Sequence, residues 1–174
     1  SHWAVLPVLV PMCAAPVCSL LRNARVAWAF ATFVCFTTFA IALHLFGLVW
    51  DQGTLVYSMG GWAAPWGIEY RLDVLNAGML VLVSGVASLV ILGTRSSVLS
   101  EIPANRHGLF FTCWILCLTG LLGISITGDA FNVFVFLEVS SLSTYALVAM
   151  GRDPRALTAS FRYLIMGTIG ATFI

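Results

Sequence analysis

The chain has 174 residues, of which 60% are hydrophobic and only 9% charged, and its formal net charge is +1. Because a soluble domain carries about 25% charged residues, this composition excludes an ordinary soluble fold and indicates an integral membrane protein. All eight Lys-plus-Arg residues are arginine, which excludes a P-loop lysine. The absence of a basic cluster in the sequence argues against nucleic acid as a partner.

Apolar runs separated by short polar segments predict an all-α integral membrane fold with six transmembrane helices. Each run is about as long as a helix must be to cross the ~30 Å hydrocarbon core of a bilayer. In chain order the runs cover residues 3–21, 26–49, 72–94, 109–126, 130–150 and 157–174. The first run contains three prolines, so we expect a kinked helix there.

The segment between the second and third runs, residues 50–70, is rich in glycine and proline and contains three tryptophans. Glycine and proline stop helices, and tryptophan suits a membrane interface. We therefore expect a surface loop with a short extended hairpin around residues 54–57 and 67–70. Just after it, Arg71 and Asp73 are predicted to form an ion pair at the level of the lipid headgroups. The alternative is that Asp73 serves as a point of proton uptake.

The polar turn at residues 127–129 is too short for its flanking helices to be anything but antiparallel neighbours. Asp129 is placed to cap the N-terminus of the following helix. A role for Asp129 in proton uptake is the alternative interpretation.

Five cysteines lie within the apolar runs, and Cys113 and Cys117 are spaced to share one helix face. No histidine or carboxylate accompanies this pair in its run, and buried cysteine commonly acts as a small hydrophobic residue. We therefore predict no metal site and no soluble cofactor. His44, alone near the far end of the second run, is interpreted as a packing residue, with a titrating relay as the alternative.

Glu138 is a lone carboxylate in the middle of the run 130–150. A charge at that depth costs about 2.5–3.5 kcal/mol on insertion scales, so it usually faces a helix bundle or a wet cavity and has a function. Desolvation favours the protonated form of a carboxyl group, which suits a group that binds and releases protons. Ser141, Thr144 and Tyr145 follow at helical spacing and are predicted to line a short polar path beside it. The alternative is that a protonated Glu138 hydrogen-bonds a neighbouring helix as a packing device.

Arg162 is a second charge inside an apolar run, near the start of the sixth. One interpretation is that its side chain snorkels to the membrane interface. The other makes Arg162 a charge partner that modulates the proton affinity of Glu138, across a gap of roughly 10 Å along the bilayer normal between straight helices. Both interpretations stay open at the level of the sequence.

The arginines are distributed unequally between the two sides of the predicted bundle. If the loops alternate, one side holds six arginines and the other holds only Arg71. The six are Arg22, Arg25, Arg95, Arg106, Arg152 and Arg155. The positive-inside rule then predicts a multi-pass protein of the inner (cytoplasmic) membrane, with its N-terminus outside and its arginine-rich loops in the cytoplasm.

The segment TGDAFNVFVFLEVSSLSTYALVAMGRD and the following ALTASFRYLIMGTIGATF resemble the D subunit of Mrp-type monovalent cation/proton antiporters. That protein shares a superfamily with the antiporter-like membrane subunits of respiratory complex I and of membrane-bound hydrogenases. The resemblance is specific over residues 128–174 and looser over GGWAAPWGIEYRLDVLNAGM.

The resemblance implies a subunit of about fourteen helices with two inverted repeats joined by a polar axis at mid-membrane. Glu138 matches the fifth-helix glutamate of the family, which pairs with a lysine on the seventh helix and is needed for proton translocation. Arg162 falls where many relatives have a basic residue. Residues 1–107 would form an N-terminal three-helix region with an outer loop at 50–71, and residues 108–174 the start of the first antiporter-like repeat. Since the sequence stops within the sixth predicted helix, we expect the N-terminal part of a longer subunit, with a short or split subunit as the alternative.

Together these features predict a proton-translocating subunit of a multi-subunit monovalent cation (Na⁺)/proton antiporter, with the proton relayed through Glu138. Its partners would be other membrane subunits, the lipid bilayer, protons and Na⁺. The alternative is the proton-pumping membrane arm of a redox enzyme similar to complex I (NADH-quinone oxidoreductase) or to a hydrogenase, whose redox chemistry lies in other subunits. We therefore expect a transporter subunit rather than an enzyme. A purely structural anchor is the third interpretation, and it predicts that replacing Glu138 has no effect on transport.

Overall fold

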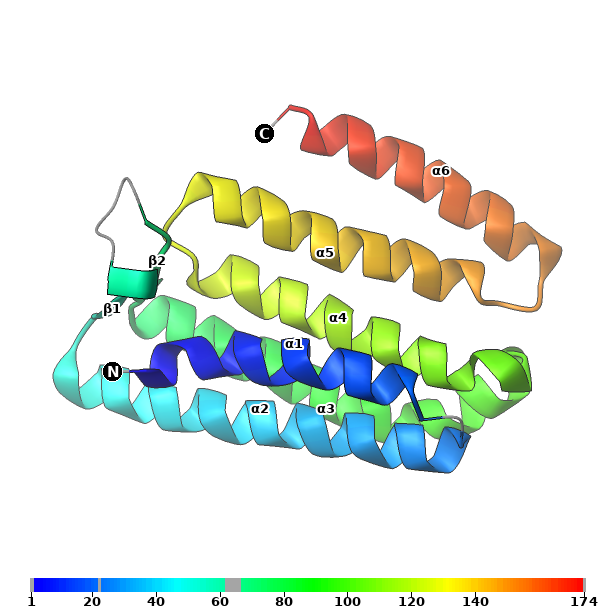
Figure 1. Cartoon of the computed structure of the whole chain (residues 1–174), viewed down its shortest axis with the longest axis horizontal. Coiled ribbons are helices and arrows are strands. Elements are labelled where there is room, and N and C mark those ends of the chain that lie inside the picture. Colours follow the sequence, from blue (N-terminus) through cyan, green and yellow to red (C-terminus); the bar gives the residue numbers. More distant parts are fainter. Residues whose placement is uncertain (1, 22, 62–66, 174) are drawn as a thin grey trace.

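The structure is a computed structural model that describes residues 2–21, 23–61 and 67–173. Within these residues, α-helices run antiparallel to one another in chain order (Figure 1). They are α1 (Leu6–Ser19), α2 (Ala24–Gln52), α3 (Val74–Glu101), α4 (His107–Ile126), α5 (Ala130–Ala149) and α6 (Pro154–Ala171). Short 3-10 helices at His2–Val5, Met59–Gly61 and Ala104–Arg106 precede α1, follow the first strand and precede α4.

Polar side chains cap the starts of α2, α3, α5 and α6. Asp73 accepts a hydrogen bond from the backbone N–H of Asn76 at 2.8 Å and so caps α3. Asp129 accepts from the N–H of Phe131 at 3.2 Å and caps α5, which confirms the cap predicted there. The predicted ion pair between Arg71 and Asp73 is not formed among the described residues, and the carboxylate of Asp73 binds the N-terminus of α3 instead.

Four described helices are long and apolar enough to span a bilayer: α2, α3, α4 and α5. The first predicted span corresponds to a shorter apolar helical segment, Trp3–Ser19, with Pro11 and Pro16 inside α1, and it is not among these four. The 18 residues of α6 include Arg155 and Arg162, and it is not among the four apolar spans. α3 continues beyond the predicted end at 94 to Glu101, because no glycine or proline lies between residue 94 and Pro103.

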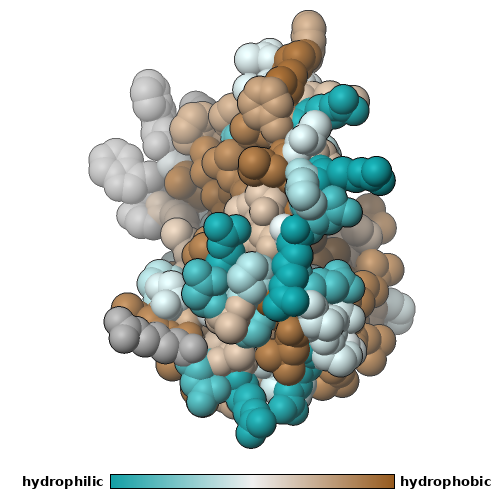
Figure 2. Space-filling model, turned by 90° about the vertical axis from the view of Figure 1, so that its right-hand side faces the viewer, coloured by the Kyte–Doolittle hydropathy of each residue, from teal (hydrophilic) through white to brown (hydrophobic). Residues whose placement is uncertain are grey.

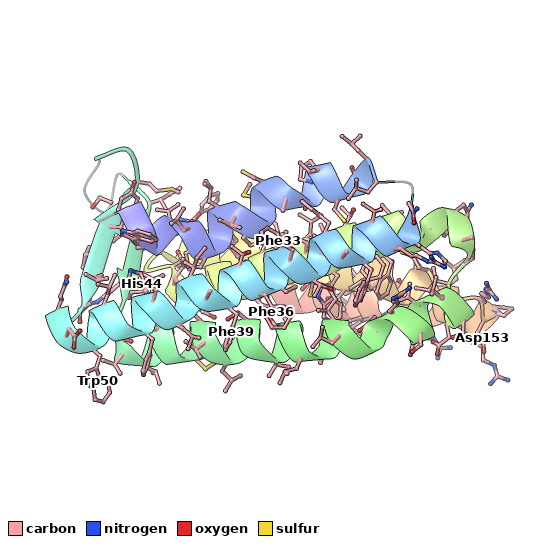
Figure 3. The ribbon with its side chains drawn as sticks, turned by 90° about the horizontal axis from the view of Figure 1, so that it is seen from below. Phe33, Phe36, Phe39, His44, Trp50 and Asp153 are labelled. Carbon is pink, nitrogen blue, oxygen red and sulfur yellow. The ribbon has the colours of Figure 1, made fainter. Side chains whose placement is uncertain are left out.

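α4 is the central helix of the bundle. It packs against α1, α2, α3 and α5, whereas α6 packs on the far side of α5 (Figure 1). Seen from below, α2 runs between α1 and α3, and its ring of Phe39 lies against Gly85 of α3 (Figure 3). His44, also on α2, packs edge-to-face on Trp3 with ring centroids 5.0 Å apart. The apolar core therefore lies between α1, α2, α3 and α4, and α5 and α6 extend the bundle on one side.

The predicted hairpin is present between α2 and α3. Strands β1 (Leu55–Ser58) and β2 (Glu69–Leu72) pair antiparallel with Leu55 opposite Leu72. The hairpin docks on the turn between α4 and α5, where the N–H of Gly128 donates to the carbonyl of Glu69 at 2.9 Å. Two of the tryptophans predicted to mark this loop, Trp62 and Trp66, lie outside the described residues.

The two ends of the bundle differ. The hairpin and the α4–α5 turn form one end, and the loops that join α1 to α2, α3 to α4 and α5 to α6 form the other (Figure 1). Seen from this second end, hydrophilic residues gather between flanks of apolar side chains (Figure 2). Polar ends and apolar sides are the pattern expected of a bundle that crosses a membrane.

Candidate functional site around Glu138

Glu138 lies near the middle of α5, one of the four helices that are apolar enough to span a membrane. Its side chain is half-buried. Within the described part of the chain it forms no hydrogen bond and no ion pair. A carboxyl group in this position therefore depends on protonation, on water or on a group outside the described residues to offset its desolvation.

The face of α5 that carries Glu138 meets α6. Tyr145 is seven residues further along and, at about 100° per residue, lies on almost the same side of the helix. Its ring packs edge-to-face on Tyr163 of α6, with centroids 4.9 Å apart. The hydroxyl of Ser160 donates to the carbonyl of Tyr145 at 2.7 Å. Glu138 and Tyr145 thus lie on the same stripe of α5, and α6 contacts that stripe at Tyr145.

Ser141 is half-buried on α5, three residues after Glu138, and therefore within about 60° of it around the helix. Thr144 departs from the predicted shared face. Its hydroxyl donates to the carbonyl of Ser140 at 2.8 Å and lies 3.4 Å from Sγ of Cys117 on α4. Six residues of helix rotate a side chain about 120° away from its starting face, so Thr144 lines the α4 side and does not join Glu138.

Arg162 is exposed on α6. In the part of the chain that the structure describes, it forms no ion pair with Glu138 or with any other acid. The structure does not bring Arg162 and Glu138 together. Whether Arg162 snorkels to the membrane interface or modulates the proton affinity of Glu138 stays a prediction.

The two candidate residues for proton uptake lie at the hairpin end. Asp73 and Asp129 are both half-buried, and each caps a helix with one carboxylate oxygen. Asp129 starts the helix that carries Glu138, about 13 Å away along the axis at ~1.5 Å per residue. Their structural role is therefore established, and an additional role in proton uptake stays a prediction.

Asn132 is a polar residue of the same helix that the sequence analysis did not single out. Its side chain is only 6% exposed. It lies one turn before Phe136, on the side of α5 that faces α4. Its Nδ2 has no hydrogen-bond partner among the described residues. The sequence could have indicated Asn132, because a side-chain amide within an apolar run usually needs a hydrogen-bond partner inside a membrane.

One groove beside α5 does not include Glu138. A groove of about 420 Å³ lies between α3, α4 and α5, with Val86, Leu118 and Leu147 among its apolar lining residues. Thr144 and Cys117 also line it. The groove and the Glu138 stripe thus occupy opposite sides of α5.

The chain is similar in sequence to membrane subunits of known complexes. No protein-family model matches the chain. The N subunit of NADH-quinone oxidoreductase from Desulforudis audaxviator is 39% identical over 99% of the chain and 35% of its own length. The probable D subunit of a K⁺/H⁺ antiporter from Rhizobium meliloti is 35% identical over 94% of the chain and 31% of its own length. The chain thus spans about a third of the length of these curated relatives.

Solved structures agree with the sequence relatives. A chain of the membrane-bound sulfane sulfur reductase, an archaeal respiratory membrane complex, matches 99% of this chain with a TM-score of 0.90 and 29% identity. A chain of the Mrp complex from Dietzia sp. DQ12-45-1b matches 99% with a TM-score of 0.86 and 24% identity, which bears on the fold. This chain covers 35% and 33% of those two chains.

The chain is therefore a homologue, over nearly all its own length, of antiporter-like membrane subunits, among them the D subunit of a probable K⁺/H⁺ antiporter and the N subunit of NADH-quinone oxidoreductase.

Proposed function

We propose that this chain forms part of a proton-translocating subunit of a multi-subunit monovalent cation/proton antiporter, with Glu138 as the group that binds and releases the proton. The observation that carries the proposal is the half-buried carboxyl group of Glu138 near the middle of an apolar helix. No described residue compensates it. Placing a charged carboxylate there costs free energy unless it is protonated, hydrated or paired. This cost favours proton uptake by Glu138, as a proton-binding role requires.

The surroundings of Glu138 support the same role. Ser141 and Tyr145 place two hydroxyl groups on or near its stripe of α5, and α6 covers that stripe at Tyr145. Arg162 on α6 would modulate the proton affinity of Glu138 if its side chain turns toward α5. The proposed complete subunit has about fourteen helices, of which α1 to α6 would be the first six, and a lysine beyond them would pair with Glu138.

A redox-driven proton pump is the second candidate function. The similarity of the chain to the N subunit of an NADH-quinone oxidoreductase, at 39% identity, favours it. The proton-binding role of Glu138 would be the same in both complexes, because the redox chemistry of the enzyme would lie in its other subunits. The proteins that co-purify with the full-length subunit separate the two, since iron–sulfur proteins favour the redox enzyme.

The test is Glu138→Gln in the full-length subunit, assembled with its partners in inverted membrane vesicles. We expect loss of the proton movement that Na⁺ or K⁺ induces, measured with a pH-sensitive dye, because a glutamine cannot release a proton. Assembly should be unchanged, since the amide has nearly the same shape. Glu101→Gln is the matched control, because Glu101 is an exposed glutamate at the end of α3. An assembled Glu138→Gln variant that still exchanges at the normal rate would refute the proposal.

A further inference from the structure

Two arginines from different helices converge on one small hollow at the arginine-rich end of the bundle. Arg25 lies in the first turn of α2, and Arg95 lies in the last third of α3. The hollow between them is lined by Ala24, Arg25, Trp28, Arg95, Val98, Leu99 and Phe111. No acidic residue is in this lining, so the hollow carries an uncompensated positive charge.

Trp28 holds the hollow in shape. Its indole Nε1 donates to the carbonyl of Ile91 at 3.0 Å and so ties α2 to α3. Cζ of Arg95 lies 5.2 Å from the centroid of the same indole ring, in a cation–π contact. The guanidinium of Arg95 is therefore held beside the hollow by an aromatic ring, without an acidic partner.

The positive charge at this place has no partner in the described residues. Arg25 and Arg95 are both exposed, and neither forms an ion pair there. α2 begins at Ala24 beside the hollow, and Asn23 caps the N–H of Arg25. The remaining N–H groups of the first turn add partial positive charge. Two guanidinium groups and a helix N-terminus around one point favour an anion.

The size and surroundings of the hollow indicate what kind of anion fits. Its volume is about 10 Å³, which is room for about one water-sized group. A hollow of this size admits one phosphate oxygen and leaves the remainder of a headgroup at the surface. Further along the same two helices, Phe36 of α2 and Leu92 of α3 are 42% and 48% exposed. Figure 3 shows Phe36 on the side of α2 next to α3. These apolar side chains offer a surface for acyl chains within a lipid's reach of the arginines.

We infer that the hollow between Arg25 and Arg95 is a binding site for the phosphate of an acidic membrane phospholipid, whose acyl chains lie along α2 and α3. Basic pockets between transmembrane helices are a recurring mode of headgroup recognition. This site lies on the α2–α3 side of α4, whereas Glu138 lies on α5, beyond α4. The inference is therefore independent of the proposed proton path.

The test uses the full-length subunit in its assembled complex, placed in phosphatidylcholine nanodiscs with increasing fractions of phosphatidylglycerol. Native mass spectrometry counts the phosphatidylglycerol molecules that remain bound. We expect Arg25→Gln and Arg95→Gln each to weaken retention of one lipid about fivefold, and the double variant about twenty-fivefold, from about 1 kcal/mol per arginine near a membrane surface. Replacing both arginines by lysine should restore most of the binding, because the charge returns.

Arg155→Gln is the matched control, since Arg155 is exposed at the same end of the bundle but does not line the hollow. It should leave retention unchanged.

Equal losses in Arg155→Gln and Arg95→Gln would overturn the inference in favour of general surface attraction, and unchanged retention in the double variant would overturn it outright. Displacement of the lipid by inorganic phosphate would show a site for a soluble anion instead. If the unsubstituted complex retains no lipid and the double variant loses a partner subunit, the hollow binds an acidic protein instead. Thermal unfolding in pure phosphatidylcholine should be the same for all variants.

Discussion

At the scale of single residues, glycine allows α4 to approach α5 closely. Gly120 of α4 lies directly against α5, and a Cβ added there would stand 2.6 Å from the backbone nitrogen of Ser140 and 2.7 Å from the carbonyl oxygen of Phe136. Backbone atoms cannot turn away as a flexible side chain does. Gly120 therefore sets how closely α4 approaches the helix that carries Glu138.

We expect Gly120→Ala to destabilise the full-length subunit by about 1–3 kcal/mol, the usual cost of overpacking, because α4 and α5 must separate. Chemical denaturation in detergent measures this. Gly47→Ala is the control: Gly47 is exposed on α2, and a Cβ there meets nothing within 4 Å. That change should be neutral or stabilise by about 0.5–1 kcal/mol, the helix preference of alanine. Equal effects of the two substitutions would contradict the role assigned to Gly120.

At the scale of elements, the hairpin is fastened to the turn that begins α5. Tyr70 of β2 forms an isolated antiparallel bridge with Thr127, and Gly128 donates to Glu69 beside it. Tyr70 is only 3% exposed, and burial raises the pKa of its phenol above the ordinary value. The hairpin thus holds the start of the Glu138 helix through backbone contacts and one buried ring.

This contact should weaken at alkaline pH. The pKa of Tyr70 is higher in the folded than in the unfolded chain, because burial disfavours the phenolate. Its contribution is therefore fully present below the ordinary tyrosine pKa of about 10 and is lost as the pH rises through the raised folded value. Thermal unfolding followed by near-ultraviolet circular dichroism between about pH 8 and pH 11 measures the loss. Tyr70→Phe should unfold normally at neutral pH and show a smaller alkaline decline; an identical decline in both proteins would rule Tyr70 out as its source.

At the scale of the whole molecule, charge separates the two ends of the bundle. The described arginines at the end opposite the hairpin are Arg25, Arg95, Arg106, Arg152 and Arg155. The hairpin end carries Arg71 and the acids Asp51, Glu69, Asp73 and Asp129. The positive-inside rule predicts that the first end faces the cytoplasm.

That orientation predicts which end a membrane-impermeant thiol reagent reaches in intact cells. Thr54 beside the hairpin and Ser100 near the end of α3 are both exposed, and each is replaced by cysteine in a background without the native cysteines. Thr54→Cys should be labelled in intact cells and Ser100→Cys only after permeabilisation. The reverse pattern would invert the orientation, and labelling of both after permeabilisation serves as the control.

The sequence by itself determined the features of this protein that depend on neighbours along the chain. Apolar runs of bilayer length predicted the spanning helices α2 to α5, Asp129 predicted the cap of α5, and turn residues predicted the hairpin. Each of these signals is local, because a helix start or a strand turn depends on residues within a few positions. The lengths of α1 and α3 were less well predicted, since prolines and the polar end of α3 blur the boundary between span and loop.

Only the tertiary structure decided which face of each helix meets which neighbour. Thr144 and Tyr145 are adjacent in sequence, yet Thr144 faces Cys117 of α4 while Tyr145 lies against Gly167 and Tyr163 of α6. Small residues far apart in the sequence allow these contacts, and their pairing cannot be deduced from one helix alone. The same holds for the hollow between Arg25 and Arg95, which come from different helices far apart in the sequence. Hydrophobicity along the chain decides what enters the membrane, and close packing between helices decides which polar groups meet there.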